Sequence, residues 1–251
     1  MLKLMEYEFR KTRLTKLIIL VITAVAEVLF LGGLYTDRYT LMGCSIFALM
    51  MLAFLGVFVI GLESIVALHR DMNTKQSYML FMTPHSCYSI LGAKTLECCL
   101  SILLTGVCFF ALGALDVSLL FAREGKLVDL WDFIHELLAN ITINGHSLEI
   151  DPGTLAALVF VLLAAWILTI ITAFLAVTIS AALLNGRRFS GVISFVLFLA
   201  LSLGCSLLTN LVTRPIPGNI TVMMVHGLLS LVFAAVMYFV TAKIMEDKLS
   251  V

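Results

Sequence analysis

Three acidic side chains and one histidine lie within long apolar stretches of the sequence, where a functional or structural role must offset the free-energy cost of burying them. They are Glu27, Glu63, Glu97 and His226. A charged side chain at the centre of a bilayer costs about 3 kcal/mol on insertion scales, so such residues usually face a helix-bundle interior or a wet cavity. For Glu27, a role in a substrate path or proton relay and a role as a buried hydrogen-bonded clamp stay equally open. For Glu63 and Glu97 the structural role is favoured, because both lie near the end of a stretch.

Two pairings follow from the positions of these residues. Lys94 precedes Glu97 by three residues, a spacing that places both on one face of a helix. His226 lies at a depth comparable to that of Glu27 and could be its partner, although a lone histidine in a span is more often packed and hydrogen-bonded. Glu27, Glu63 and His226 are our candidates for a translocation path.

The sequence carries no signature of a catalytic site. It contains no G-x-x-x-x-G-K-[ST] phosphate loop, no G-x-S-x-G and no H-E-x-x-H. Asp132, His135 and Glu136 have the spacing of a metal corner, but a solvated acidic face is the favoured interpretation. We therefore expect no catalytic, cofactor-binding or metal-binding residue and no cofactor, and the chain itself is not expected to be an enzyme.

The composition is typical of an integral membrane protein. Of its 251 residues, 61% are hydrophobic and 13% charged, and the mean hydropathy is +1.10, whereas soluble domains carry roughly a quarter charged residues. The six cysteines lie in or beside apolar runs and are expected to pack as small hydrophobes. A span needs about 20 apolar residues, and six runs qualify: residues 17–35, 41–68, 88–115, 154–184, 189–212 and 221–242.

Basic residues predict the orientation of these spans. Twelve of the 16 Lys and Arg residues flank one side of the predicted spans, leaving Arg38, Arg123, Lys126 and Arg214 on the other. Because basic residues resist translocation, both termini are expected in the cytoplasm, as an even number of spans requires. The chain is thus expected to be a multi-pass protein of the cell membrane. The start also resembles a cleavable signal peptide, but its apolar run continues to Leu34, which favours a span.

Two segments outside the spans have patterns of their own. Residues 1–16 place Leu2, Met5 and Phe9 near helical spacing, which predicts an amphipathic helix lying in the membrane interface. Residues 116–153 predict an external cap, made of an amphipathic helix and a hairpin around Asn144-Gly145. The expected fold is therefore an all-α integral membrane protein with a single transmembrane domain over residues 1–251, an interfacial N-terminal helix and a small helix–hairpin cap.

The loop between the second and third spans is unusual for a connector. Residues 78–82 are apolar, Pro84 ends that run, and Ser86 could cap a helix that continues into the third span. Here the chain resembles the permeases of type-2 ABC exporters, in which an acidic residue, a lysine, a tyrosine, an apolar stretch, a proline and a second lysine follow in this order. The matching residues are Asp71, Lys75, Tyr78, Phe81, Thr83-Pro84, Ile90-Leu91 and Lys94.

The resemblance implies a function and partners. The chain would be the transmembrane permease subunit of an ATP-driven exporter of a peptide or amphipathic compound, working with separate ATPase subunits, a second permease subunit and the lipid bilayer, and with no nucleic acid. The loop would receive the ATPase motion through a set of coupling residues, Tyr78, Leu80, Phe81, Pro84 and His85.

The chain also departs from the family's pattern. Family members often carry basic residues after the proline, and their larger external element commonly lies between the last two spans. Two alternatives therefore stay open, an ion-coupled or substrate-binding carrier with Glu27 and His226 as its site, and a non-transporting membrane scaffold or immunity protein.

Overall fold

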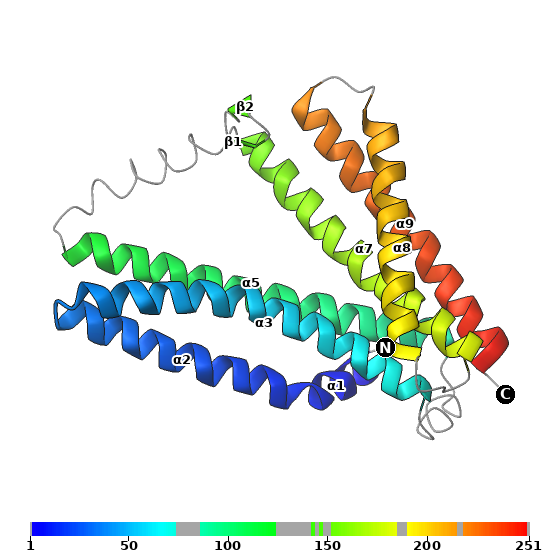
Figure 1. The fold of residues 1–251 in the computed structure, drawn as a ribbon, viewed down its shortest axis with the longest axis horizontal. Helices are drawn as coiled ribbons and strands as arrows, with labels where there is room; N and C mark the ends of the chain where they lie inside the picture. The colour runs from blue at the N-terminus through cyan, green and yellow to red at the C-terminus, as the bar shows by residue number, and fades with distance from the viewer. Residues whose placement is uncertain are drawn as a thin grey trace. The chain divides into compact units, whose positions relative to one another are not determined.

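The computed structural model describes residues 2–73, 86–123, 142–143, 146–147, 152–184, 190–214 and 218–249 (Figure 1). Six of its helices are long and apolar enough to cross a membrane. The helices are α1 (Leu2–Lys11), α2 (Arg13–Tyr35), α3 (Tyr39–Asn73), α5 (Cys87–Arg123), α7 (Pro152–Leu184), α8 (Ser190–Thr213) and α9 (Asn219–Leu249). The predicted number of spans is thereby confirmed.

Several helices extend beyond the apolar runs that predicted them. Helix α3 continues to Asn73, α5 to Arg123 and α9 to Leu249, each five to eight residues past the end of its run. The added turns carry charged residues, which favour water at the ends of a span but are compatible with helical backbone. Helices α5 and α7 run without interruption.

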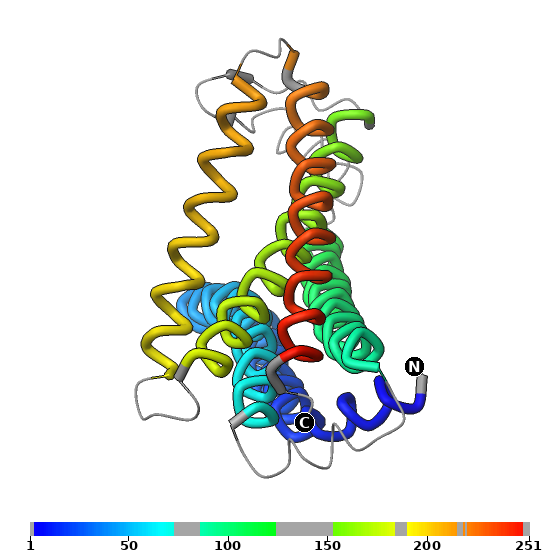
Figure 2. The backbone as a smooth tube through the Cα atoms, turned by 90° about the vertical axis from the view of Figure 1, so that its right-hand side faces the viewer, coloured from blue at the N-terminus to red at the C-terminus, as the bar shows by residue number. Residues whose placement is uncertain are grey.

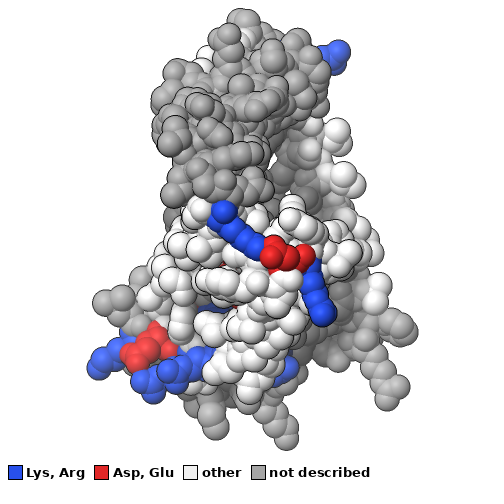
Figure 3. Space-filling model, turned by 90° about the vertical axis from the view of Figure 1, so that its left-hand side faces the viewer, with Lys and Arg blue, Asp and Glu red and all other residues white. Residues whose placement is uncertain are grey.

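The surface of the described helices is rich in large apolar side chains. Phe54, Phe110 and Leu211 expose 72%, 80% and 74% of their surface. Uncharged side chains cover most of the described surface in Figure 3, and charged ones gather in small groups. Apolar surface exposed on this scale is stable in contact with lipid but not in contact with water. The chain is a multi-pass, all-α membrane protein.

Hydroxyl groups within these helices bond to their own backbone. Thr178, Thr209 and Ser230 each donate to the carbonyl four residues earlier, at 2.8 to 2.9 Å. This bond satisfies the hydroxyl without a partner on another helix, which an apolar environment demands. Such Ser and Thr residues therefore need no functional explanation.

The helices fall into two compact units. Unit 1 contains residues 1–12, 61–100 and 156–251, and α7 is its central helix. Every residue from Ile170 to Thr178 in α7 is buried, as expected of a helix with neighbours on all sides. The Thr172 hydroxyl contacts the sulfur of Met237 in α9 at 3.3 Å, and the Ser180 hydroxyl donates to the Ser190 carbonyl at the start of α8 at 2.7 Å. Figures 1 and 2 show α8 and α9 beside α7.

Unit 2 contains residues 13–60 and 101–155, and its core joins three helices. Ala26 and Phe30 of α2 pack with Leu49 of α3, and Leu120 of α5 packs against this cluster. The connection from α2 to α3 is tight, with Asp37 at φ 56°, a left-handed conformation that Asp tolerates.

Arg123 ties the end of α5 to the α2–α3 connection. Its guanidinium donates to the Leu34 carbonyl and to the Asp37 carboxylate. A cation at a helix C-terminus satisfies an orphan carbonyl there.

The two segments predicted outside the spans differ in outcome. Helix α1 ends at Lys11, so the expected helix over residues 1–16 is too long, and Arg13 already belongs to α2. Strands β1 (Thr142–Ile143) and β2 (His146–Ser147) pair antiparallel, as the hairpin pattern predicts. Asn144-Gly145 and the predicted cap helix at residues 127–141 lie outside the described residues.

Gly33 generates a stability prediction, because the backbone of α3 approaches it closely. A Cβ atom at Gly33 would lie 2.9 Å from the Met42 nitrogen, and a backbone atom cannot move aside as a side chain can. We expect Gly33→Ala to lower the free energy of unfolding by about 1–3 kcal/mol, measured by SDS-induced unfolding in mixed micelles.

The adjacent glycine is the matched control. Nothing lies within 4 Å of a Cβ at Gly32, so Gly32→Ala should be neutral or stabilising by up to about 1 kcal/mol. Equal stability of the two variants would contradict the close approach.

Candidate functional site

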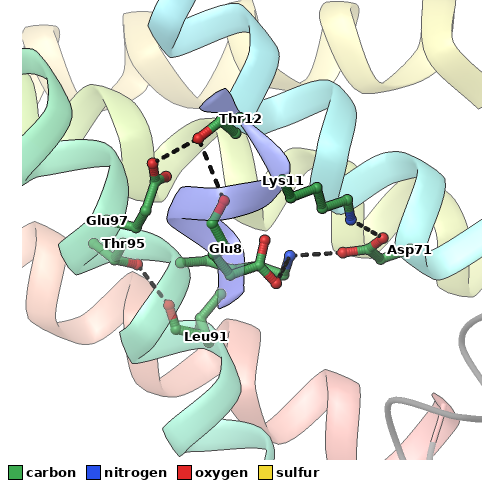
Figure 4. Close-up of polar contacts among 8 residues, drawn as sticks. Glu8, Lys11, Thr12, Asp71, Leu91, Thr95 and Glu97 are labelled. Atoms are coloured by element: carbon green, nitrogen blue, oxygen red, sulfur yellow. Dashed lines mark hydrogen bonds and ion pairs between the residues drawn. The ribbon is translucent and has the colours of Figure 1, made fainter. Parts of the chain in front are cut away.

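A buried ammonium group joins three helices at one end of unit 1 (Figure 4). Lys94 of α5 donates to the Glu8 carboxylate of α1 at 2.7 Å and to the Asp71 carboxylate of α3 at 2.6 Å. The three side chains expose only 3%, 5% and 8% of their surface. Lys94, Glu8 and Asp71 therefore form a buried ionic junction.

Two further side chains of the N-terminal segment complete this junction. Lys11 donates to the second Asp71 oxygen at 2.5 Å, and Thr12 donates to the Glu97 carboxylate of α5 at 3.0 Å. Two ammonium groups thus face the two carboxylates of Glu8 and Asp71, and Thr12 links this ionic group to a third carboxylate, that of Glu97. We call Glu8, Lys11, Thr12, Asp71, Lys94 and Glu97 the α1 junction.

Removing one member of such a junction costs more free energy than the complete junction contributes. Burying ions is costly, and their attraction offsets this cost only when every charge keeps its partner. Removing one partner leaves an uncompensated charge, which costs about 3–5 kcal/mol. The α1 junction therefore holds α1 against α3 and α5 as long as it is complete.

The same end of unit 1 fixes both flanks of the loop at residues 74–85. On the α3 side, Asp71 belongs to the junction, and the His69 ring lies 3.4 Å from the Ser190 hydroxyl of α8. On the α5 side, the Ser86 hydroxyl accepts from the Ser89 amide, which confirms the predicted helix cap. The Tyr238 hydroxyl of α9 donates to the Tyr88 carbonyl at 2.6 Å. The coupling residues themselves, Tyr78, Leu80, Phe81, Pro84 and His85, lie outside the described residues.

A second acidic cluster lies in unit 2. Glu27 of α2 and Asp116 of α5 share a side-chain hydrogen bond. Asp116 exposes only 8% of its surface. Two adjacent carboxyl groups repel each other when both are ionised. The pair is therefore costly within a span unless a proton or a cation compensates it.

The structure adds partners that the sequence did not suggest. Lys94 bonds Glu8 and Asp71 in addition to any local contact that its spacing predicts. Glu27 contacts Asp116 within unit 2, while His226 belongs to α9 in unit 1, and its pairing with Glu27 stays a prediction. Glu63 lies partly buried in α3.

The burial of Asp116 shows that the predicted end of the third span, at residue 115, is wrong. The sequence placed residue 116 at the start of the external cap, but α5 continues to Arg123 and buries Asp116. Val117, Leu119, Leu120 and Phe121 continue the apolar pattern past Asp116 and are the signal that could have revealed it. Glu8 carried no such signal, because it lies among charged neighbours.

Two further predictions concern metal ligands and cysteines. Asp132, His135 and Glu136 lie outside the described residues, and within the described part of the chain no cluster of His, Cys, Asp and Glu could hold a metal ion. All six cysteines are free thiols, and Cys87, Cys98 and Cys205 are buried. The α1 junction and the Glu27–Asp116 pair are thus the two candidate sites.

Lys94 is the residue whose loss should damage the α1 junction most. Lys94→Met removes the ammonium and leaves Glu8 as a buried, uncompensated carboxylate. We expect the free energy of unfolding to fall by about 3–5 kcal/mol, measured by SDS-induced unfolding. The double variant Glu8→Gln/Lys94→Met should regain part of this loss, because Lys11 still compensates Asp71.

An exposed ion pair on the same helix provides the control. Arg10 and Glu6 bond at 2.7 Å but expose 68% and 61% of their side chains. Arg10→Ala should cost less than about 1 kcal/mol. A Lys94→Met variant as stable as Arg10→Ala would show that the junction contributes little.

Comparison with known proteins does not assign a family. No protein-family model, no curated protein and no solved structure matches the chain. The function must therefore be argued from the chain's own residues.

Proposed function

We propose that the chain is the membrane-spanning permease subunit of an ABC exporter. Six long apolar helices supply the architecture, and the loop pattern from Asp71 to Lys94 supplies the resemblance. The subunit would pair with a second permease, the same or related, and with separate ATPase chains. Its cargo would be a peptide or an amphipathic compound.

The observation that carries this proposal is the anchoring of both flanks of the loop. The two ends of the resembling segment, Asp71 and Lys94, bond to each other at 2.6 Å across the loop's base. Glu8 and Lys11 of α1 complete the clamp. A loop that transmits force needs a stiff base, because a flexible base would absorb the displacement. A mere connector needs no such clamp.

The mechanism follows from this stiffness. When the ATPases close, they would push on the coupling residues at 78–85, and the ends of α3 and α5 would move together with α1. Packed helices shift as bodies because interiors are close-packed. Movement of these helices would then change access to a path between the two permease subunits. The chain's part is mechanical, and the hydrolysis belongs to its partners.

One observation favours the second candidate, an ion-coupled carrier. Glu27 and Asp116 bring two carboxyl groups together within the span, and intramembrane carboxyls of this kind occur in proton relays. In this version Asp116 replaces His226 as the partner of Glu27. The two candidates differ in energy source, so dependence on ATP or on a proton gradient separates them.

The exporter proposal predicts a docking defect at Phe81. Residues 78–82 are apolar, and each large apolar side chain gains about 1.5–3 kcal/mol when a partner surface covers it. A carboxylate there would be buried without a partner. We expect Phe81→Asp to give an inserted, monodisperse subunit that no longer copurifies with an ATPase and no longer stimulates ATP hydrolysis.

Arg214→Asp is the control, since Arg214 is exposed and predicted to lie on the opposite side. It should keep the ATPase at wild-type stoichiometry. If Phe81→Asp also keeps it, the loop is not the docking element. If no ATPase copurifies with the wild type in several mild detergents, the carrier replaces the exporter.

The proposed orientation predicts a labelling pattern. In a cysteine-free background, Arg38→Cys and Arg214→Cys should react with a membrane-impermeant maleimide on intact cells, and Lys243→Cys should react only after permeabilisation. All three positions are exposed, so reactivity reports sidedness. Labelling of Lys243→Cys from outside would overturn the orientation.

A further inference from the structure

A cavity of about 680 Å³ lies in unit 2 between α2 and the middle of α5. Its walls are mainly apolar, and they include Leu20, Ala24, Leu104, Val107, Phe109 and Leu112. Gly56 of α3 lies against Ile19 and Phe109, two of the lining residues. Small-molecule sites typically occupy about 300–1,000 Å³ and combine apolar walls with a few polar groups, so the cavity has the size and lining of such a site.

The polar groups in these walls are few. Thr23 and Thr105 donate to the carbonyls of Ile19 and Ser101 in their own helices, at 2.8 Å. Their hydroxyls are therefore already used. Lys16 and Glu27 line the cavity at positions eleven residues apart on α2, which is about 16 Å along a helix. Glu27 is thus a carboxyl group set among apolar side chains, well away from Lys16.

Glu27 also has unused bonding capacity. Its Oε2 atom is buried, and within the described part of the chain it has no hydrogen-bond partner. The Oδ1 atom of Asp116 is in the same state. A buried polar atom without a partner is costly, and in native structures it usually marks a missing ion, water or ligand.

The lining of the cavity indicates what would fill this need. Among its described lining residues Glu27 is the acidic one, so an ionised Glu27 would place one negative charge among apolar walls. Within an apolar cavity, a single positive charge would compensate it, because attraction is stronger where water is excluded. A neutral apolar molecule would fill the walls but leave this charge uncompensated.

We infer that this cavity binds an apolar or amphipathic molecule that carries one positive charge. Glu27 contacts the charge, the walls of α2 and α5 hold the apolar part, and Asp116 positions the Glu27 carboxyl group. Binding itself needs no ATPase. That this molecule class is also the cargo rests on the proposed function.

The test measures binding to the full chain in nanodiscs of phosphatidylcholine. The probes are radiolabelled tetraphenylphosphonium and tetraphenylborate, which share one shape and carry opposite charges, and empty nanodiscs correct for partition into lipid. We expect saturable binding of one phosphonium per chain and no saturable binding of borate. Glu27→Gln should weaken phosphonium binding at least tenfold, while its amide preserves hydrogen bonding to Asp116 and the unfolding midpoint.

Three further variants sharpen the result. Ala24→Phe fills the cavity and should abolish binding with Glu27 intact. Asp116→Asn leaves an amide donor and the Glu27 charge, so binding should stay within a few-fold of wild type. Asp247→Asn removes an exposed carboxylate of α9 and should change nothing.

Two outcomes would overturn the inference. One is equal binding of phosphonium and borate, which would make the cavity an apolar groove for lipid. The other is unchanged phosphonium affinity in Glu27→Gln. Failure of the exporter proposal gives a different pattern, because phosphonium would still bind through Glu27 while no ATPase copurified.

Discussion

Polar groups within hydrocarbon have no water to bond, so each must find its partner inside the protein. Helices satisfy the backbone along almost the whole described chain. Hydroxyls such as those of Thr178 and Thr209 satisfy themselves on the preceding turn. Ionisable side chains cannot do this locally, and they require partners from other helices. Their contacts therefore determine which helices are held together, and both candidate sites follow from this requirement.

The α1 junction illustrates how this constraint holds helices together. Asp71 and Lys94 lie on either side of residues 74–85, and Glu8 comes from the N-terminal helix. Lys94 is buried between the carboxylates of Glu8 and Asp71, so its loss would leave Glu8 buried without its ammonium partner. The ion pair between Lys94 and Asp71 ties α5 to α3 on either side of residues 74–85. A partner that pushes on the loop would move α1 with the ends of α3 and α5, rather than bend the loop alone.

Sequence patterns predicted the features that depend on local spacing. They did not predict contacts between residues that lie far apart in the sequence. Apolar runs predicted all six spans, and Ser86 predicted the start of α5. Span ends were less predictable, because Asp116 resembles the start of a loop until its burial against Glu27 is known. The partners of Lys94 lie 86 and 23 residues away in sequence, beyond any periodicity. The sequence singles out Glu27 as costly to bury, but only the structure shows Asp116 beside it.

The two clusters differ in the cations that lie close to their carboxyl groups. In the α1 junction, Lys11 and Lys94 bond the carboxylates of Glu8 and Asp71. The Glu27–Asp116 pair has no described cation at hydrogen-bond distance, retains unpartnered oxygens and lies beside a cavity. Under the binding that we infer, a proton and a cationic ligand would compete for Glu27. Such competition would be a means of binding and releasing a charged molecule within a membrane, whichever energy source drives the helices.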